Sequence, residues 1–227
     1  MIAIDDSTTL GQALDAACAA YGPLPLLAVP ANPQRDYDPQ GREISYAEAG
    51  LAIAQLSQAY QAAGYGLGHR VALFLESRPE HVLHKLALNR LGACVVPVNP
   101  DYRPQELAYL IQHAQVDLIV VLACRLPAVL AALAEPPQLT ALPTADAGAA
   151  PALAVLEGAA PPTLPLARRP AEHGAVTGDT PASILYTSGT TGRPKGCVLS
   201  HTYELAAGAW YAGQQGLVSL REGQERL

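Results

Sequence analysis

Positive charge is scarce in this sequence, and long apolar runs are absent. Its 227 residues include 14 lysines and arginines against 20 aspartates and glutamates, a formal net charge of −6. The longest basic run is the pair Arg168-Arg169, so we expect no nucleic-acid partner. The apolar runs, such as residues 118–123, have the length of strands, so we expect no transmembrane segment.

The sequence also lacks an export signal and paired cysteines. Residues 1–6 contain no basic segment, and no long apolar segment follows them, so we expect a cytoplasmic protein. No Cys-x-x-Cys pair occurs. We interpret the cysteines as buried or half-buried thiols without a metal or disulfide role. They are Cys18, Cys94, Cys124 and Cys197.

What the sequence does contain is enough apolar material for a packed core. Half of the residues are hydrophobic and only 15% are charged, which excludes disorder along the whole length. The length suits one sizeable domain, or one and a half. For an acidic, alanine-rich chain of this kind, chemistry on small molecules is the default expectation.

Helical and extended patterns alternate in the first half of the chain. Spacing of apolar residues predicts helices over residues 8–21, 46–63, 79–91 and from Pro104 onward. Apolar runs predict strands over residues 26–29, 42–45, 71–75, 93–98 and 117–122. The later strands are apolar on both faces, so helices must cover both sides of the sheet. The predicted fold class is therefore α/β, with a parallel sheet covered by helices on both faces.

The pattern changes in the second half. We interpret residues 1–142 as an N-terminal α/β subdomain that ends with a helix at 126–134 and a strand at 139–142. Residues 143–180 are interpreted as an irregular excursion rich in alanine and proline. The last part, 181–227, is predicted to carry a strand at 183–186, a strand at 197–199 and a helix after Ser200.

Between the last two predicted strands lies the segment that carries the chemistry, residues 186–196 with the sequence YTSGTTGRPKG. Its centre holds only Ser, Thr and Gly, and such a loop can turn successive backbone N–H groups inward around an anion. Lys195 adds a mobile positive charge suited to phosphate. We predict that the phosphates of ATP are bound by Thr187, Ser188, Gly189, Thr190, Thr191, Gly192 and Lys195.

Two other interpretations of this loop fit less well. A Walker A loop needs four residues between its first glycine and Gly-Lys-Ser/Thr. Here Gly189 is followed by Gly192, and Lys195 by Gly196. A flexible Ser/Gly linker is the second alternative. Linkers rarely lie between two apolar strands and end in Pro-Lys-Gly, so we favour the phosphate site.

These residues carry a family resemblance. Residues 184–196, ILYTSGTTGRPKG, match the signature phosphate-loop motif of the adenylate-forming superfamily, and VLSH at 198–201 continues the likeness. Residues 44–48, 66–73 and 91–100 resemble the family more weakly, with His69 standing where aspartate is usual. Residues 97–107 look more like acyl-CoA synthetases than like peptide-synthetase domains.

The resemblance implies an ATP-dependent, AMP-forming ligase that joins a fatty or other organic acid to coenzyme A. The carboxylic acid attacks the α-phosphate of Mg-ATP to give an acyl-adenylate and pyrophosphate, and a thiol then displaces AMP. The implied co-substrates are ATP, Mg²⁺ and coenzyme A. The loop and Lys195 would hold the departing pyrophosphate, Tyr186 would pack at the base of the loop, and Arg193 would point to solvent.

The family's later motifs are missing, among them a Tyr-Gly-x-Thr-Glu segment and the C-terminal lysine. Thr177-Gly178-Asp179 superficially matches the ribose motif, but it precedes the loop, so we interpret it as a turn. We therefore expect an incomplete N-terminal domain of an adenylate-forming enzyme, a fragment without ligase turnover of its own and without an assigned catalytic residue. A non-catalytic nucleotide-binding module and an adenylating enzyme with a carrier-protein acceptor stay open as alternatives.

Two further groups of residues are given no functional role. His81 and His84 lie three positions apart on a predicted helix, but a zinc site would need a third ligand. We predict no metal site there and place both histidines on a solvent-facing surface. Trp210 and Tyr211 are interpreted as core packing of the last helix.

Overall fold

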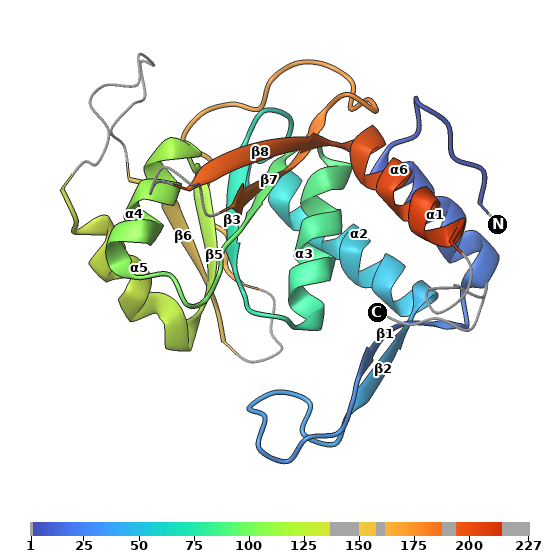
Figure 1. Cartoon of the computed structure of the whole chain (residues 1–227), viewed down its shortest axis with the longest axis horizontal. Helices are drawn as coiled ribbons and strands as arrows, with labels where there is room; N and C mark the ends of the chain where they lie inside the picture. Colours follow the sequence, from blue (N-terminus) through green and yellow to red (C-terminus); the bar gives the residue numbers. More distant parts are fainter. Residues whose placement is uncertain (1, 137–149, 158–161, 188–193, 215–227) are drawn as a thin grey trace.

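The computed structural model describes residues 2–136, 150–157, 162–187 and 194–214. A six-stranded sheet with the order β6-β5-β3-β4-β7-β8 runs through the molecule, and β1 and β2 form a separate antiparallel pair (Figure 1). Neighbouring strands from β6 to β7 pair in parallel, whereas β8 is antiparallel to β7. The predicted α/β class is confirmed, and β8 is the exception to the parallel arrangement.

The elements follow the predicted order closely. The strands are β1 (Pro25–Val29), β2 (Arg42–Ser45), β3 (Arg70–Phe74), β4 (Cys94–Pro97), β5 (Leu118–Leu122), β6 (Ala152–Leu156), β7 (Pro181–Thr187) and β8 (Lys195–Ser200). The helices are α1 (Leu10–Tyr21), α2 (Tyr46–Ala62), α3 (Pro79–Arg90), α4 (Pro104–His113), α5 (Leu126–Leu133) and α6 (His201–Ala212), with a short 3₁₀ turn η1 (Ala123–Arg125) before α5.

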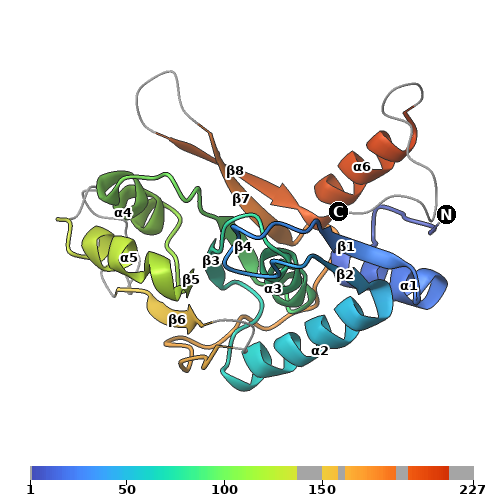
Figure 2. The ribbon, with the colours of Figure 1, turned by 90° about the horizontal axis from the view of Figure 1, so that it is seen from below.

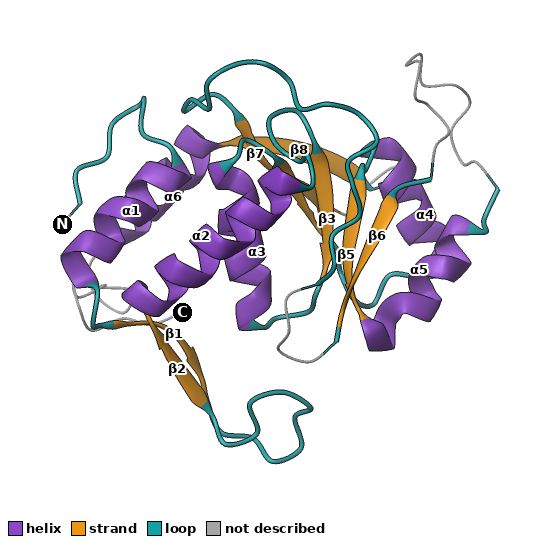
Figure 3. Cartoon of the chain, turned by 180° about the vertical axis from the view of Figure 1, so that it is seen from behind, coloured by secondary structure: helices purple, strands orange, loops and turns teal. Residues whose placement is uncertain are grey.

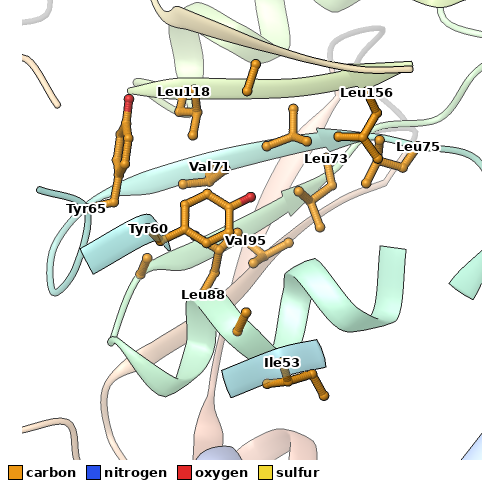
Figure 4. Close-up of a cluster of buried hydrophobic side chains, with 14 of the residues drawn as sticks. Ile53, Tyr60, Tyr65, Val71, Leu73, Leu75, Leu88, Val95, Leu118 and Leu156 are labelled. Carbon is orange, nitrogen blue, oxygen red and sulfur yellow. The ribbon is translucent and has the colours of Figure 1, made fainter. Parts of the chain in front are cut away.

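Helices cover both faces of the sheet, as the apolar strands require (Figure 3). Along β3, Val71 and Leu73 join a core cluster with α1, α2 and α3, whereas Ala72 and Phe74 join a second cluster with α4 and α5. Figure 4 shows the first cluster, in which Tyr60 of α2 and residues of β3, β4 and β5 meet. The sheet is therefore the shared wall between two packed cores.

Local sequence sets where the helices begin. Ser45 caps α2 in a capping box with Glu48, so two backbone N–H groups at the helix start find partners. Helices α3 and α4 begin with Pro79 and Pro104, whose missing N–H and fixed φ suit the first helical position. Gly92 ends the α3 region with a φ of 77°, a conformation that glycine adopts without steric cost.

The sequence interpretation needs correction at β6. These residues, 152–156, were expected within the irregular excursion over 143–180, yet they form a strand that pairs in parallel with β5 from Leu118↔Ala152 to Leu122↔Leu156. Ala154 and Leu156 are buried in the core cluster that also contains residues of α2 and α3. The strand predicted at 139–142 lies outside the described residues.

Helix α6 also departs from expectation. Trp210 and Tyr211 were predicted to pack in the core, but they are 61% and 57% exposed, and their rings meet edge-on with centroids 5.0 Å apart. The cysteines divide similarly. Cys94 is buried and Cys18 half-buried, as predicted, whereas Cys124 and Cys197 are exposed.

Within 2–136, 150–157, 162–187 and 194–214, every helix is too short or too polar to be a candidate membrane span.

The prediction of a solvent-facing histidine pair is wrong for His84. Its side chain is only 2% exposed, and its Nδ1 lies 2.6 Å from the hydroxyl oxygen of Tyr60 in α2. The ring also meets the Tyr60 ring edge-on, with centroids 5.8 Å apart. Burial lowers the pKa of His84 from 6.5 to about 4, with a smaller contribution from the neighbouring charge of His81. His84 is therefore a neutral core residue joining α2 to α3.

This burial predicts acid destabilisation. Because the folded-state pKa is depressed, the contribution of His84 is complete above about pH 6.5 and is lost as the pH falls toward 4. From pH 7 to pH 4 the free energy of unfolding should fall by about 3 kcal/mol on account of this group. His84→Gln keeps an acceptor for Tyr60 and does not titrate, so urea denaturation should show a smaller pH dependence in that variant. An equal loss in both proteins would contradict this assignment.

Candidate phosphate-binding site

The predicted phosphate loop lies between the two strands of a hairpin. Strands β7 and β8 pair antiparallel along their length, and the last pair before the loop is Thr187↔Lys195. Residues 188–194 therefore connect two strand positions that lie opposite each other. Figure 2 shows the β7–β8 hairpin extending from the sheet, away from α2. The strand that the sequence predicts after the loop is confirmed, which distinguishes the site from a strand–loop–helix phosphate site.

The structure places two of the seven predicted phosphate ligands. Thr187 and Lys195 lie directly opposite each other at the end of the hairpin, and both are exposed. No described residue forms an ion pair with Lys195. The others, Ser188, Gly189, Thr190, Thr191 and Gly192, lie outside the described residues, as does Arg193.

A polar network holds the base of the hairpin. Glu204 in the first turn of α6 accepts a hydrogen bond from the Ser183 hydroxyl at 2.6 Å, and its other oxygen pairs with the Lys85 ammonium at 2.7 Å. Asn89 of α3 donates to the Ala182 carbonyl at 2.7 Å. The Lys85 and Glu204 side chains are only 21% and 19% exposed, so this ion pair is shielded from water. It ties α3, β7 and α6 together.

His201, the first residue of α6, makes a second connection. It is fully buried, and its Nδ1 accepts a hydrogen bond of 3.0 Å from the backbone N–H of Leu10 at the start of α1. Its Nε2 is buried without a hydrogen-bond partner in the described part of the chain. Burial, and then the nearby charge of Lys85, lower its pKa. The neutral ring therefore joins the start of the chain to the end of β8.

The Thr177-Gly178-Asp179 segment is a turn, as predicted. The Thr177 N–H donates to the Thr180 hydroxyl at 2.9 Å, and the N–H of Thr202 in α6 donates to the Gly178 carbonyl at 2.9 Å. A Cβ on residue 178 would lie 2.3 Å from the Asp6 carbonyl oxygen and 2.4 Å from the Thr202 hydroxyl. Only glycine fits this close approach of backbone to backbone. The segment therefore leads the chain into β7.

Tyr186 packs beside α4 near the loop end of the hairpin. Its hydroxyl oxygen lies 2.7 Å from Nδ1 of His113, the last residue of α4. Burial raises the pKa of the Tyr186 phenol, with a smaller contribution from Tyr109. The phenol therefore stays protonated and can donate to an unprotonated Nδ1. The family resemblance implies only that Tyr186 packs at the base of the loop, whereas its partner on α4 is found from the structure.

Several supports of the hairpin could not be found from the sequence. Lys85 and Glu204 are 119 positions apart, and His113 and Tyr186 are 73 apart. The one local signal is Glu204, an acidic residue in the first turn of a helix that Ser200 caps through the Tyr203 N–H. Its partners come from other elements, so only the fold reveals them.

The described residues offer no protein-made metal centre. Across 2–136, 150–157, 162–187 and 194–214, three or more His, Cys, Asp or Glu side chains nowhere gather as metal ligands would.

Solved structures show the fold class of this chain. The long-chain-fatty-acid-CoA ligase FadD1 from Archaeoglobus fulgidus matches with a TM-score of 0.70 at 23% identity, covering 92% of this chain and 40% of that one. The N-terminal domain of FACL13 from Mycobacterium tuberculosis matches with a TM-score of 0.69 at 21% identity, covering 92% and 48%. This chain thus has the fold of the N-terminal domains of adenylate-forming enzymes.

Sequence comparisons identify the family. The pattern described as AMP-binding enzyme matches residues 28–224. Crotonobetaine/carnitine–CoA ligase of Salmonella paratyphi A is 31% identical over 192 residues, which cover 80% of this chain and 34% of that protein. Tyrocidine synthase 3 of Brevibacillus parabrevis is 30% identical over 161 residues, 70% of this chain and 2% of that protein. The chain belongs to the AMP-binding enzyme family and spans about a third of the length of the CoA ligase.

The network at the base of the hairpin predicts a clear loss of stability when its cation is removed. Lys85→Met leaves the shielded Glu204 carboxylate without its ion-pair partner, which should lower the free energy of unfolding by about 2 kcal/mol in urea denaturation. Arg90→Met is a matched control, because Arg90 and Asp15 form an exposed pair, 36% and 56% exposed, worth less than about 1 kcal/mol. Equal losses in the two variants would show that the pair does not support the hairpin.

Proposed function

We propose that this chain supplies the ATP-phosphate-binding part of an AMP-forming acid–CoA ligase. In the proposed reaction a carboxylate oxygen of a fatty or other organic acid attacks the α-phosphorus of Mg-ATP, and pyrophosphate leaves. The thiol of coenzyme A then attacks the acyl carbon of the adenylate, and AMP leaves. ATP, Mg²⁺ and coenzyme A enter as substrates, so the protein's task is positioning and charge stabilisation.

The observation that carries this proposal is the pairing of Thr187 with Lys195 across the mouth of the hydroxyl- and glycine-rich loop. That pairing brings Thr187 and Lys195 to opposite positions at the end of the hairpin, where both residues are exposed. A lysine point charge with hydrogen-bond donors around it suits the β- and γ-phosphates. The family to which the chain belongs supports the nucleotide as the ligand.

The proposed ligands are those predicted from the sequence, and their roles follow from their chemistry. Lys195 would balance the charge that develops on the departing pyrophosphate. The backbone N–H groups of the loop would bind the phosphate oxygens, and the hydroxyls would add donors. The proposed site consists of Thr187, Ser188, Gly189, Thr190, Thr191, Gly192 and Lys195.

The name of one relative favours coenzyme A as the acceptor, and the name of another keeps a second acceptor in view. Crotonobetaine/carnitine–CoA ligase is named for a CoA thioester product and matches over 80% of this chain. Tyrocidine synthase 3, which is a synthase and not a CoA ligase by name, matches over 70% of this chain. We therefore propose coenzyme A as the thiol and retain a carrier-protein thiol as the second candidate.

Nucleotide binding provides the first test. Wild-type protein should be stabilised by ATP according to mass action, by about 2.7 kcal/mol at 100 times the dissociation constant. Lys195→Ala should weaken ATP binding about tenfold, since a charge-assisted hydrogen bond is worth about 1.5–3 kcal/mol. Thermal-shift titrations would give both values.

Arg42→Ala serves as the matched control, because Arg42 is an exposed cation on β2, in the sheet separate from the hairpin. It should bind ATP as the wild type does. If Lys195→Ala and Arg42→Ala weakened ATP binding equally, a general effect of net charge would replace the proposed site.

Turnover provides a second test. The sequence contains neither the later Tyr-Gly-x-Thr-Glu segment nor the C-terminal lysine of the family, so we propose that these 227 residues bind ATP without adenylating an acid. Incubation with Mg-ATP, labelled pyrophosphate and a panel of fatty and aromatic acids should give no acid-dependent exchange of pyrophosphate into ATP. Exchange that depends on one of the acids would overturn this part of the proposal.

A further inference from the structure

The loop-bearing end of the hairpin has little support from the sheet. Strand β7 pairs with β4 through a single register pair, Val95↔Ser183, near the start of β7. Beyond that point its partner is β8, which is the edge strand of the sheet. Leu185 and Val198 are 41% and 59% exposed there. The positions that open and close the phosphate loop therefore need a contact outside the sheet.

Tyr186 provides that contact from the hairpin side. It directly precedes Thr187, and its ring packs against the core cluster that contains the buried residues of α4. Across the hairpin it faces Gly196. A Cβ at position 196 would lie 2.9 Å from Ile184 Cγ2 and 3.1 Å from Tyr186 Cζ. The glycine thus leaves the space in which the Tyr186 ring lies beside its own strand pair.

His113 provides the contact from the α4 side. Its ring meets the Tyr186 ring edge-on, with centroids 5.7 Å apart and an interplanar angle of 79°, and its Nδ1 lies 2.7 Å from the Tyr186 hydroxyl oxygen. On its other side His113 stacks on Tyr109, with centroids 5.2 Å apart and planes within 22°. Tyr109 and His113 are four positions apart on α4, so the helix fixes their stacking.

We propose that His113 is a positioning residue of the phosphate site: through Tyr186 it sets the place of Thr187 and, by strand pairing, of Lys195. His113 touches neither nucleotide nor acid in this role, which rests on the proposed ATP site. Loss of its contact with Tyr186 leaves the end of the hairpin free to move against α4, and the binding-competent arrangement becomes less populated. Affinity for ATP then falls by the fraction of molecules that leave this arrangement.

A double-mutant cycle on ATP affinity tests the proposal at a temperature where all variants are folded. His113→Phe keeps a ring to stack on Tyr109 but removes the hydrogen bond, and Tyr186→Phe removes the same bond from the other side. Each should weaken ATP binding about fivefold, the worth of one hydrogen bond, by isothermal titration calorimetry. Because both act on one contact, the double variant should be no weaker than either single variant.

Rescue and control variants separate positioning from general damage. His113→Gln restores an acceptor for the Tyr186 hydroxyl and should recover most of the ATP affinity. Tyr203→Phe and His173→Phe are the controls, because they make the same substitutions at exposed positions. Within the described residues, neither side chain forms a hydrogen bond. Both variants should bind ATP as the wild type does. Backbone amide exchange at Thr187 and Lys195 should be faster in His113→Phe than in His173→Phe.

The outcomes distinguish this proposal from the site on which it depends. Absence of ATP binding by the wild-type chain would overturn the proposed function and this inference together. Wild-type binding with unchanged affinity in His113→Phe and in Tyr186→Phe would overturn the role of His113 alone. If the double variant lost ATP affinity by the product of the two single fold-changes, the two residues would act separately, which also contradicts the proposal.

Discussion

The antiparallel pairing of β7 with β8 is the constraint on which the site depends. It brings Thr187 and Lys195, which lie near the two ends of the motif, to opposite positions at one end of a hairpin. A loop that begins and ends on paired strands has its ends fixed by backbone hydrogen bonds, which reduces the number of shapes open to it. The two strands therefore fix the ends of the proposed phosphate loop.

That pairing would not position the loop without support from the helices. At its base, the hairpin is held by the shielded Lys85–Glu204 pair and by the hydrogen bond from Ser183 to Glu204. At its loop end it is held by Tyr186 against His113. The two supports come from helices on opposite sides of the sheet, α3 and α4. The ion pair and the ring contact thus attach the hairpin to the rest of the domain, to which β7 is joined by only one register pair with β4.

Periodicity in the sequence predicts most elements, because each face of the central strands must be covered. Strand β6 escapes prediction because its Ala-Leu-Ala-Val-Leu pattern is short and surrounded by alanine and proline. The predictions for His84 and Trp210 are wrong for a related reason. Whether His84 is buried and Trp210 is exposed depends on contacts outside their own helices. The flanking strands of the loop are predictable locally, whereas His113 and Tyr186 are 73 positions apart and meet only in the folded chain.

The most direct measurement of the central claim is a titration of the chain with pyrophosphate, followed by NMR of labelled glycine and lysine amides. If the hairpin binds the phosphates of a nucleotide, the amide resonances of Gly189, Gly192 and Lys195 shift together and saturate with one dissociation constant. The amide resonances of Gly11 in α1 and Gly50 in α2 stay unchanged. Saturable shifts confined to residues outside 187–195, or none at any glycine, would contradict the account.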